Sequence, residues 1–91
     1  MIYYIIKGHI FTIFLSMAHL TSMSFSTKVS DYVGGQEGDF KIYELNKRKS
    51  LVFEAKRKGF SRNFITFLKD SKYHFNVSYS DDFSNKDINV K

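Results

Sequence analysis

The feature that most constrains this chain is a strict alternation of apolar and polar side chains from residue 72 to residue 79. Successive side chains of a β-strand point to opposite faces, so this period predicts a strand with one buried and one exposed face. The apolar members are Tyr73, Phe75, Val77 and Tyr79, and the polar members are Lys72, His74, Asn76 and Ser78.

The preceding segment completes a hairpin. Residues 64–68 form a continuous run of aromatic and branched side chains, which predicts a more fully buried strand. Residues 69–72 are short and polar, which is typical of a hairpin turn. The same criteria predict strands at 40–45, 51–56 and 86–91, with Leu51, Phe53 and Ala55 on one face of the second.

These strands predict a mainly β fold, either a small antiparallel sheet or a partial β-sandwich. Ten Phe and six Tyr supply apolar bulk, and the sequence contains no Trp. The predicted core residues are Phe40, Ile42, Leu51, Phe53, Phe64, Ile65, Phe67, Tyr73, Phe75 and Val77.

The first 26 residues differ from the rest. Lys7 precedes an apolar run over 10–20, and small polar residues follow, which is the order of a secretory signal peptide. We expect residues 1–26 to be a signal peptide cleaved before Phe25 or Ser26, or an uncleaved membrane-anchor helix. The alternative is a hydrophobic N-terminal strand or helix of a cytosolic domain. Residues 27–39 are predicted to be a glycine-containing linker, and residues 40–91 a β-domain. The chain stops inside its last predicted strand, which is either a short edge strand or a truncation.

The net charge of +5 is concentrated in the middle of the chain. Two basic triplets, 47–49 and 56–58, flank one predicted strand and would lie about 20 Å apart at its two ends. Such a block predicts a surface for an anionic partner, although lysines also protect exposed strands from aggregation. The predicted anionic-partner surface consists of Lys47, Arg48, Lys49, Lys56, Arg57, Lys58 and Arg62.

No constellation of residues indicates an enzyme. The chain contains no cysteine, and His74 has no other ligand type at metal-binding spacing. Residues 34–38, GGQEG, lack the Lys and Ser/Thr of a phosphate-binding loop. The acidic pair at Asp81 and Asp82 is explained by turn formation. We therefore expect no catalytic residue, no metal, no cofactor and no small-molecule substrate.

Several of these features occur together in one known family. Gly38-Asp39 precedes the strand at 40–45, residues 51–56 and 64–67 supply two more, and Tyr73-x-Phe75-x-Val77 ends the hairpin. In this order the chain resembles the N-terminal β-domain of the conjugal transfer and type IV secretion core-complex family (TrbG/TraN/CagX-like). It departs from that family in having Tyr43 where a tryptophan is usual in the first strand, and in lacking the C-terminal domain.

The resemblance implies a non-enzymatic periplasmic component that packs against copies of itself and against membrane-spanning partners. We therefore expect an exported structural or interaction module, in the periplasm or associated with a membrane, with protein partners in an envelope assembly. The alternative is a basic nucleic-acid-binding β-domain in the cytosol, because aromatic residues interleave with the basic ones. A nucleic-acid partner is the less favoured of the two, since the aromatic RNA-binding signature is absent.

Overall fold

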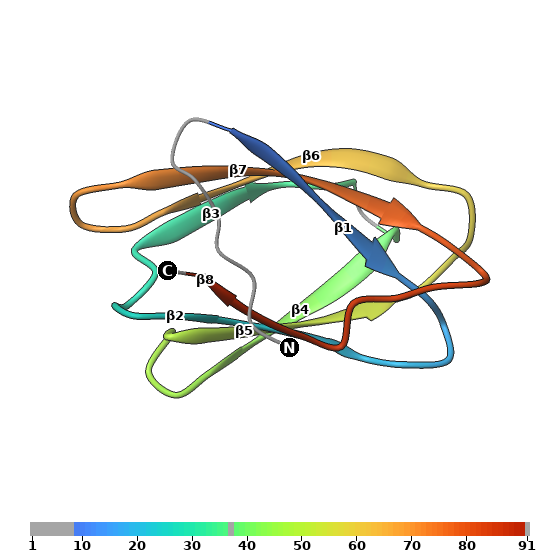
Figure 1. Ribbon diagram of the computed structural model, residues 1–91, viewed down its shortest axis with the longest axis horizontal. Coiled ribbons are helices and arrows are strands. Elements are labelled where there is room, and N and C mark those ends of the chain that lie inside the picture. The colour runs from blue at the N-terminus through green and yellow to red at the C-terminus, as the bar shows by residue number, and fades with distance from the viewer. Residues whose placement is uncertain (1–8, 37, 91) are drawn as a thin grey trace.

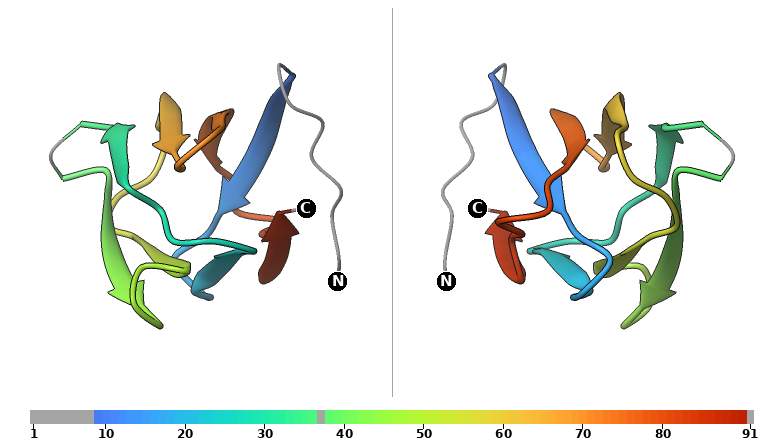
Figure 2. Two further views of the ribbon diagram at one scale, coloured as in Figure 1. Left: turned by 90° about the vertical axis from the view of Figure 1, so that its left-hand side faces the viewer. Right: turned by 90° about the vertical axis from the view of Figure 1, so that its right-hand side faces the viewer.

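A computed structural model describes residues 9–36 and 38–90, which form a β-sandwich of two four-stranded sheets (Figure 1). The first sheet has the strand order β1-β7-β6-β3, and the second has the order β4-β5-β2-β8. The strands are β1 (Ile10–Leu15), β2 (Thr21–Phe25), β3 (Asp31–Gly34), β4 (Phe40–Leu45), β5 (Ser50–Ala55), β6 (Ser61–Phe67), β7 (Lys72–Tyr79) and β8 (Asp87–Val90). Seen end-on, the two sheets face each other across the core (Figure 2).

Both sheets are mixed, which differs from the predicted antiparallel arrangement. The β6–β7 and β4–β5 hairpins are antiparallel, but β1 runs parallel to β7 and β8 runs parallel to β2. The parallel strands β1 and β8 come from opposite ends of the described chain and pair with strands far away in sequence. No tight turn joins these pairs, so nothing forces them to be antiparallel.

The strands predicted after residue 39 are confirmed within the described residues, and Lys91 of the predicted strand 86–91 lies outside them. The alternation in β7 buries Phe75 and Val77, while β5 buries Leu51, Phe53 and Ala55 on its inner face. The more complete burial predicted for residues 64–68 is wrong. Strand β6 alternates as β7 does, so Ile65 and Phe67 lie half-buried on the outer face because no further layer covers that sheet.

The anchor helix expected within residues 1–26 is absent from the described part of that segment, which forms β1 and β2 instead. The inner faces of these strands bury Ile13, Leu15, Met23 and Phe25, each at most 6% exposed. Strand β2 lies between β5 and β8, so it is an interior strand. In the described chain no helix has the length and apolar character needed to cross a bilayer. Residues 1–8 of the predicted signal segment lie outside the described residues.

The predicted linker at 27–39 also contributes to the sandwich. It contains β3, which pairs with β6, and a fully buried Val29. Gly34 lies so close to the backbone of Asn63 that a side chain there would clash, and its φ of 136° is open mainly to glycine. Glycine at position 34 therefore allows β3 to lie close to β6.

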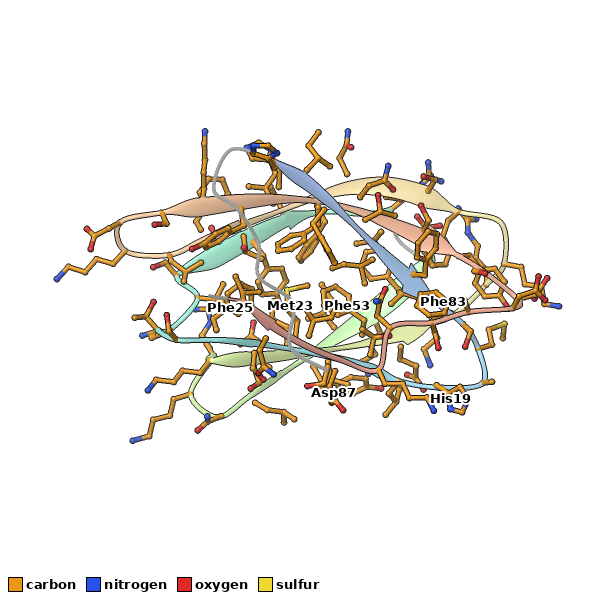
Figure 3. The ribbon with its side chains drawn as sticks, viewed as in Figure 1. His19, Met23, Phe25, Phe53, Phe83 and Asp87 are labelled. Carbon is orange, nitrogen blue, oxygen red and sulfur yellow. The ribbon has the colours of Figure 1, made fainter. Side chains whose placement is uncertain are left out.

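Aromatic rings fill the space between the sheets. Phe53 and Phe64 come from opposite sheets and meet edge to face, with centroids 5.4 Å apart. Phe40 contacts both of these rings and also Phe60, which lies in the β5–β6 connection. Figure 3 shows Phe53 in the same layer as Met23 and Phe25. The N-terminal strands thus contribute to the same core as the predicted hairpin.

The role of β2 in the core can be measured with one pair of variants. Met23→Ala is expected to lower the free energy of unfolding by about 2–5 kcal/mol, because Met23 is completely buried. Ser24→Ala, on the half-exposed outer face, is expected to lower it by less than about 1 kcal/mol. Urea denaturation of the purified native protein measures both.

The same pair tests cleavage before Phe25. If the mature protein began there, it would contain neither residue, and both variants would give wild-type unfolding curves and identical intact masses. Such a result would contradict the position of β2 in the sandwich.

Candidate anionic-partner surface

The predicted basic residues lie at opposite ends of the sandwich. Residues 46–49 form the turn between β4 and β5, and residues 56–58 follow the other end of β5. Arg62 lies on β6 near the second group, where it shares a carboxylate with Arg57. The structure therefore separates the predicted surface into two groups with different surroundings.

Nearby carboxylates pair with every basic residue of the second group. Lys56 Nζ lies 2.9 Å from Glu54 Oε1, and Lys58 Nζ lies 3.6 Å from Asp81 Oδ1. Hydrogen bonds from Lys56 and from the Tyr43 hydroxyl hold the pKa of Glu54 below its ordinary value. This end of the sandwich consequently has little uncompensated positive charge.

Asp39 is the centre of this paired group. Its side chain is completely buried, it forms an ion pair with Arg57, and Arg62 Nε donates to its Oδ2 over 2.6 Å. Burial alone would raise the pKa of Asp39, but the hydrogen bonds and charges of Arg62 and Arg57 outweigh burial, so the pKa is lowered. The backbone of Asp39 also accepts from Lys56 N and donates to Gln36 O. Arg57 and Arg62 therefore hold the β3–β4 loop in place.

The turn at the other end has an unusual backbone. Asn46, Lys47 and Arg48 have φ values of 52°, 53° and 68°, a left-handed conformation that costs each non-glycine residue roughly 1–2 kcal/mol. Tertiary hydrogen bonds hold the turn in this conformation. Phe25 N donates to Lys49 O over 2.8 Å, and Val29 N donates to Arg48 O over 2.9 Å.

These bonds join three loops from distant parts of the chain. The β2–β3 loop bonds to the β4–β5 turn through Val29, and to the end of β6 through Ser30 N and Phe67 O, 2.7 Å apart. It also lines a shallow hollow with the β6–β7 turn, which includes Lys28 and Lys69. All three loops lie at the left-hand end of the sandwich in Figure 1.

We call this end the basic end. It carries five exposed lysines, and no ion pair joins any of them to a carboxylate of the described chain. Asp31 and Asp70 are also there, and Arg48 is paired with Glu44 at 3.5 Å. The five lysines are Lys28, Lys47, Lys49, Lys69 and Lys72.

Three of these lysines were not in the predicted surface. Lys69 and Lys72 belong to the predicted hairpin turn, and Lys28 to the predicted linker, so sequence distance concealed their proximity to residues 47–49. The sequence signal that could have identified these three lysines is the concentration of lysine in the predicted turns and linker. Tertiary pairing was needed to show which turns share an end.

No metal-binding cluster accompanies this surface in the part of the chain that the structure describes. Among the residues that the structure describes, no three His, Asp or Glu side chains are grouped as metal ligands would be. His74 lies on the outer face of the first sheet between Ile10 and Ile65 in the strand register. The Asp81 carboxylate accepts from the Tyr79 hydroxyl, and Ser80 Oγ accepts from Asp82 N, which are turn interactions.

Comparison with known proteins shows that no family model and no curated protein matches the chain.

Substitution of Asp39 tests the buried ion pairs through pH. A lowered folded-state pKa means that the carboxylate stabilises the fold above its unfolded pKa of about 3.9, and that this contribution is lost as the pH falls through the folded value. Asp39→Asn is expected to be less stable than the wild type at neutral pH. The gap between their urea midpoints is expected to narrow below about pH 4.

Asp82→Asn is the matched control, because Asp82 is exposed. Its urea midpoint should follow the wild type at every pH. An Asp39→Asn protein whose acid sensitivity equals that of the wild type would show that this carboxylate does not stabilise the fold.

Proposed function

We propose that this protein is a non-enzymatic interaction module that docks through its basic end onto the anionic headgroups of a membrane. The observation that carries the proposal is the unequal pairing of its charges. At the basic end, four lysines from three loops and Lys72, which begins β7, have no ion-pair partner among the described residues, whereas the residues at 56–58 and Arg62 face carboxylates. Each lysine close to an anionic membrane contributes about 1 kcal/mol, so five supply about 5 kcal/mol at low salt.

The form of the basic end favours headgroups over nucleic acid. Four of its five lysines lie in loops or turns and Lys72 begins β7, while its one arginine, Arg48, is paired with Glu44. Single-stranded nucleic acid is usually bound by exposed aromatic rings on which bases stack. Of the rings at this end, Phe25 and Tyr73 pack on each other with centroids 6.4 Å apart, Phe25 is buried, and Phe67, opposite Lys72, is half-buried. A membrane of anionic headgroups can be bound by the lysine charges alone, without aromatic stacking.

A place in an envelope assembly, in a conjugation or type IV secretion apparatus, is part of the same proposal. Its support is the resemblance at Gly38-Asp39 and at the strands that follow, together with a β-sandwich fold that suits packing against partners. Export is proposed with residues 10–25 retained, because cleavage before Phe25 or Ser26 would remove β1 and nearly all of β2.

Two triple variants of equal net charge test the docking. Lys28→Gln, Lys47→Gln and Lys69→Gln together are expected to weaken binding to phosphatidylglycerol-containing vesicles roughly 100-fold at low salt. Lys56→Gln, Lys58→Gln and Lys86→Gln together should weaken it much less, because Lys56 and Lys58 are already paired. Vesicle co-sedimentation at low and high salt measures both.

Equal losses in the two triple variants would show that net charge alone drives binding and would remove the basic end as a site. Titration with a single-stranded oligonucleotide is the parallel experiment. Tighter and more steeply salt-dependent binding to the oligonucleotide than to vesicles would favour the nucleic-acid alternative.

A further inference from the structure

The four edge strands of the sandwich differ in how well they are protected. Strands β3 and β8 are short, with four residues each. The edge of β1 is covered at Phe14, whose N–H donates to Asn85 Oδ1 and whose C=O accepts from Asn85 N. Strand β4 has six residues and pairs in unbroken register with β5, its sole partner in the described chain. Figure 2 shows β4 at the margin of its sheet.

The hydrogen bonds of neighbouring residues show which backbone groups of β4 point outward. Asp39 O accepts from Lys56 N, so the Asp39 carbonyl points toward the β5 side. Backbone groups alternate in direction along a strand, so those of Lys41, Tyr43 and Leu45 also face β5. Lys49 O accepts from Phe25 N and therefore points toward β2. The alternation counted along β5 from this residue leads to the same assignment for β4. The N–H and C=O groups of Phe40, Ile42 and Glu44 therefore face the open edge.

We propose that the β4 edge is a self-association surface, on which β4 of a second copy of this chain pairs antiparallel about a two-fold axis through Ile42. This register joins outward-facing groups of Ile42 to its counterpart, and those of Phe40 to Glu44 of the second copy. It forms about six backbone hydrogen bonds. The β4-β5-β2-β8 sheet of one copy and the same sheet of the second copy then form one continuous eight-stranded sheet across the axis.

Side chains on the outer face select this register. It sets Lys41 opposite Tyr43 of the second copy, a contact that the single chain already makes within the strand, with Lys41 Nζ 4.9 Å from the Tyr43 ring centre. An axis through Lys41 or Glu44 would instead oppose like charges, which destabilises a strand pair. An axis through Tyr43 would set Lys41 against Leu45. The axis through Ile42 avoids both, and it pairs more of β4 than an axis through Phe40 or Leu45 at the ends of the strand.

The edge also carries apolar surface that a second copy would cover. Tyr43 is 38% exposed and Leu45 is 52% exposed, although both lie on a regular strand. The chain contains no proline, so β4 lacks one of the backbone blocks that protect edge strands against strand addition. An antiparallel dimer of this kind places the two basic ends at opposite poles, which follows from the geometry alone and does not depend on membrane binding.

Single-cysteine crosslinking tests both the dimer and its register, because the natural chain has no cysteine. Ile42→Cys is expected to form a disulfide-linked dimer under mild oxidation, since paired residues at the axis have Cα atoms about 5.5 Å apart. Tyr43→Cys alone should crosslink slowly, but should crosslink rapidly when mixed with Lys41→Cys. Faster crosslinking of Tyr43→Cys than of Ile42→Cys would overturn the proposed register.

Light scattering coupled to size exclusion tests the backbone bonds. Ile42→Pro removes an outward N–H without removing a bond to β5, so it should keep the β-sheet circular dichroism of the wild type and become monomeric. Ile42→Thr, which keeps the N–H, should remain dimeric. A wild type that is monomeric at every concentration up to about 1 mM and does not crosslink through Ile42→Cys would overturn the proposal. Because neither experiment involves lipid, their outcome is independent of the proposed docking.

Discussion

Apolar contact between the two sheets is the interaction on which the rest of this structure depends. The chain has no cysteine, so no disulfide can join the layers, and the described residues contain no metal-ligand cluster. The contacts of Phe53 with Phe64, and of Phe40 with both, link the layers directly. A domain this small has a limited core, because the fraction of surface buried on folding falls with chain length.

That limit explains why the N-terminal segment is part of the sandwich. Without β1 and β2, the second sheet would lose an interior strand, and β8 would lose the strand with which it pairs in the described chain. Full burial of side chains such as Met23 and Ile13 contributes about 1.5–3 kcal/mol each. A few such residues amount to much of the roughly 5–15 kcal/mol by which a domain is stable. An apolar N-terminal run can thus serve a small sandwich as core material.

The interactions that hold the loops also determine the electrostatics of the surface. Asp39 fixes the β3–β4 loop by binding Arg57 and Arg62, and in doing so neutralises part of one end of the sandwich. At the opposite end the loops are held by backbone hydrogen bonds, such as Val29 N to Arg48 O, which leave the lysine side chains uncompensated. Charge asymmetry therefore follows from two different ways of anchoring loops. The β4 edge lies between these two ends, so self-pairing and docking need not compete for the same residues.

What the sequence determined by itself was local. The period of two from residue 72 to residue 79 located β7 and its inner face, and the polar segment at 69–72 marked a hairpin turn, because these signals act between near neighbours. Tertiary structure decided what neighbours could not. The run at 10–20 suits a signal peptide and a buried strand equally well, and its pairing with β7 made part of it a strand. Likewise the triplets at 47–49 and 56–58 look alike in sequence, and the long-range ion pairs of Arg57 with Asp39 and of Lys58 with Asp81 distinguish the second triplet from the first.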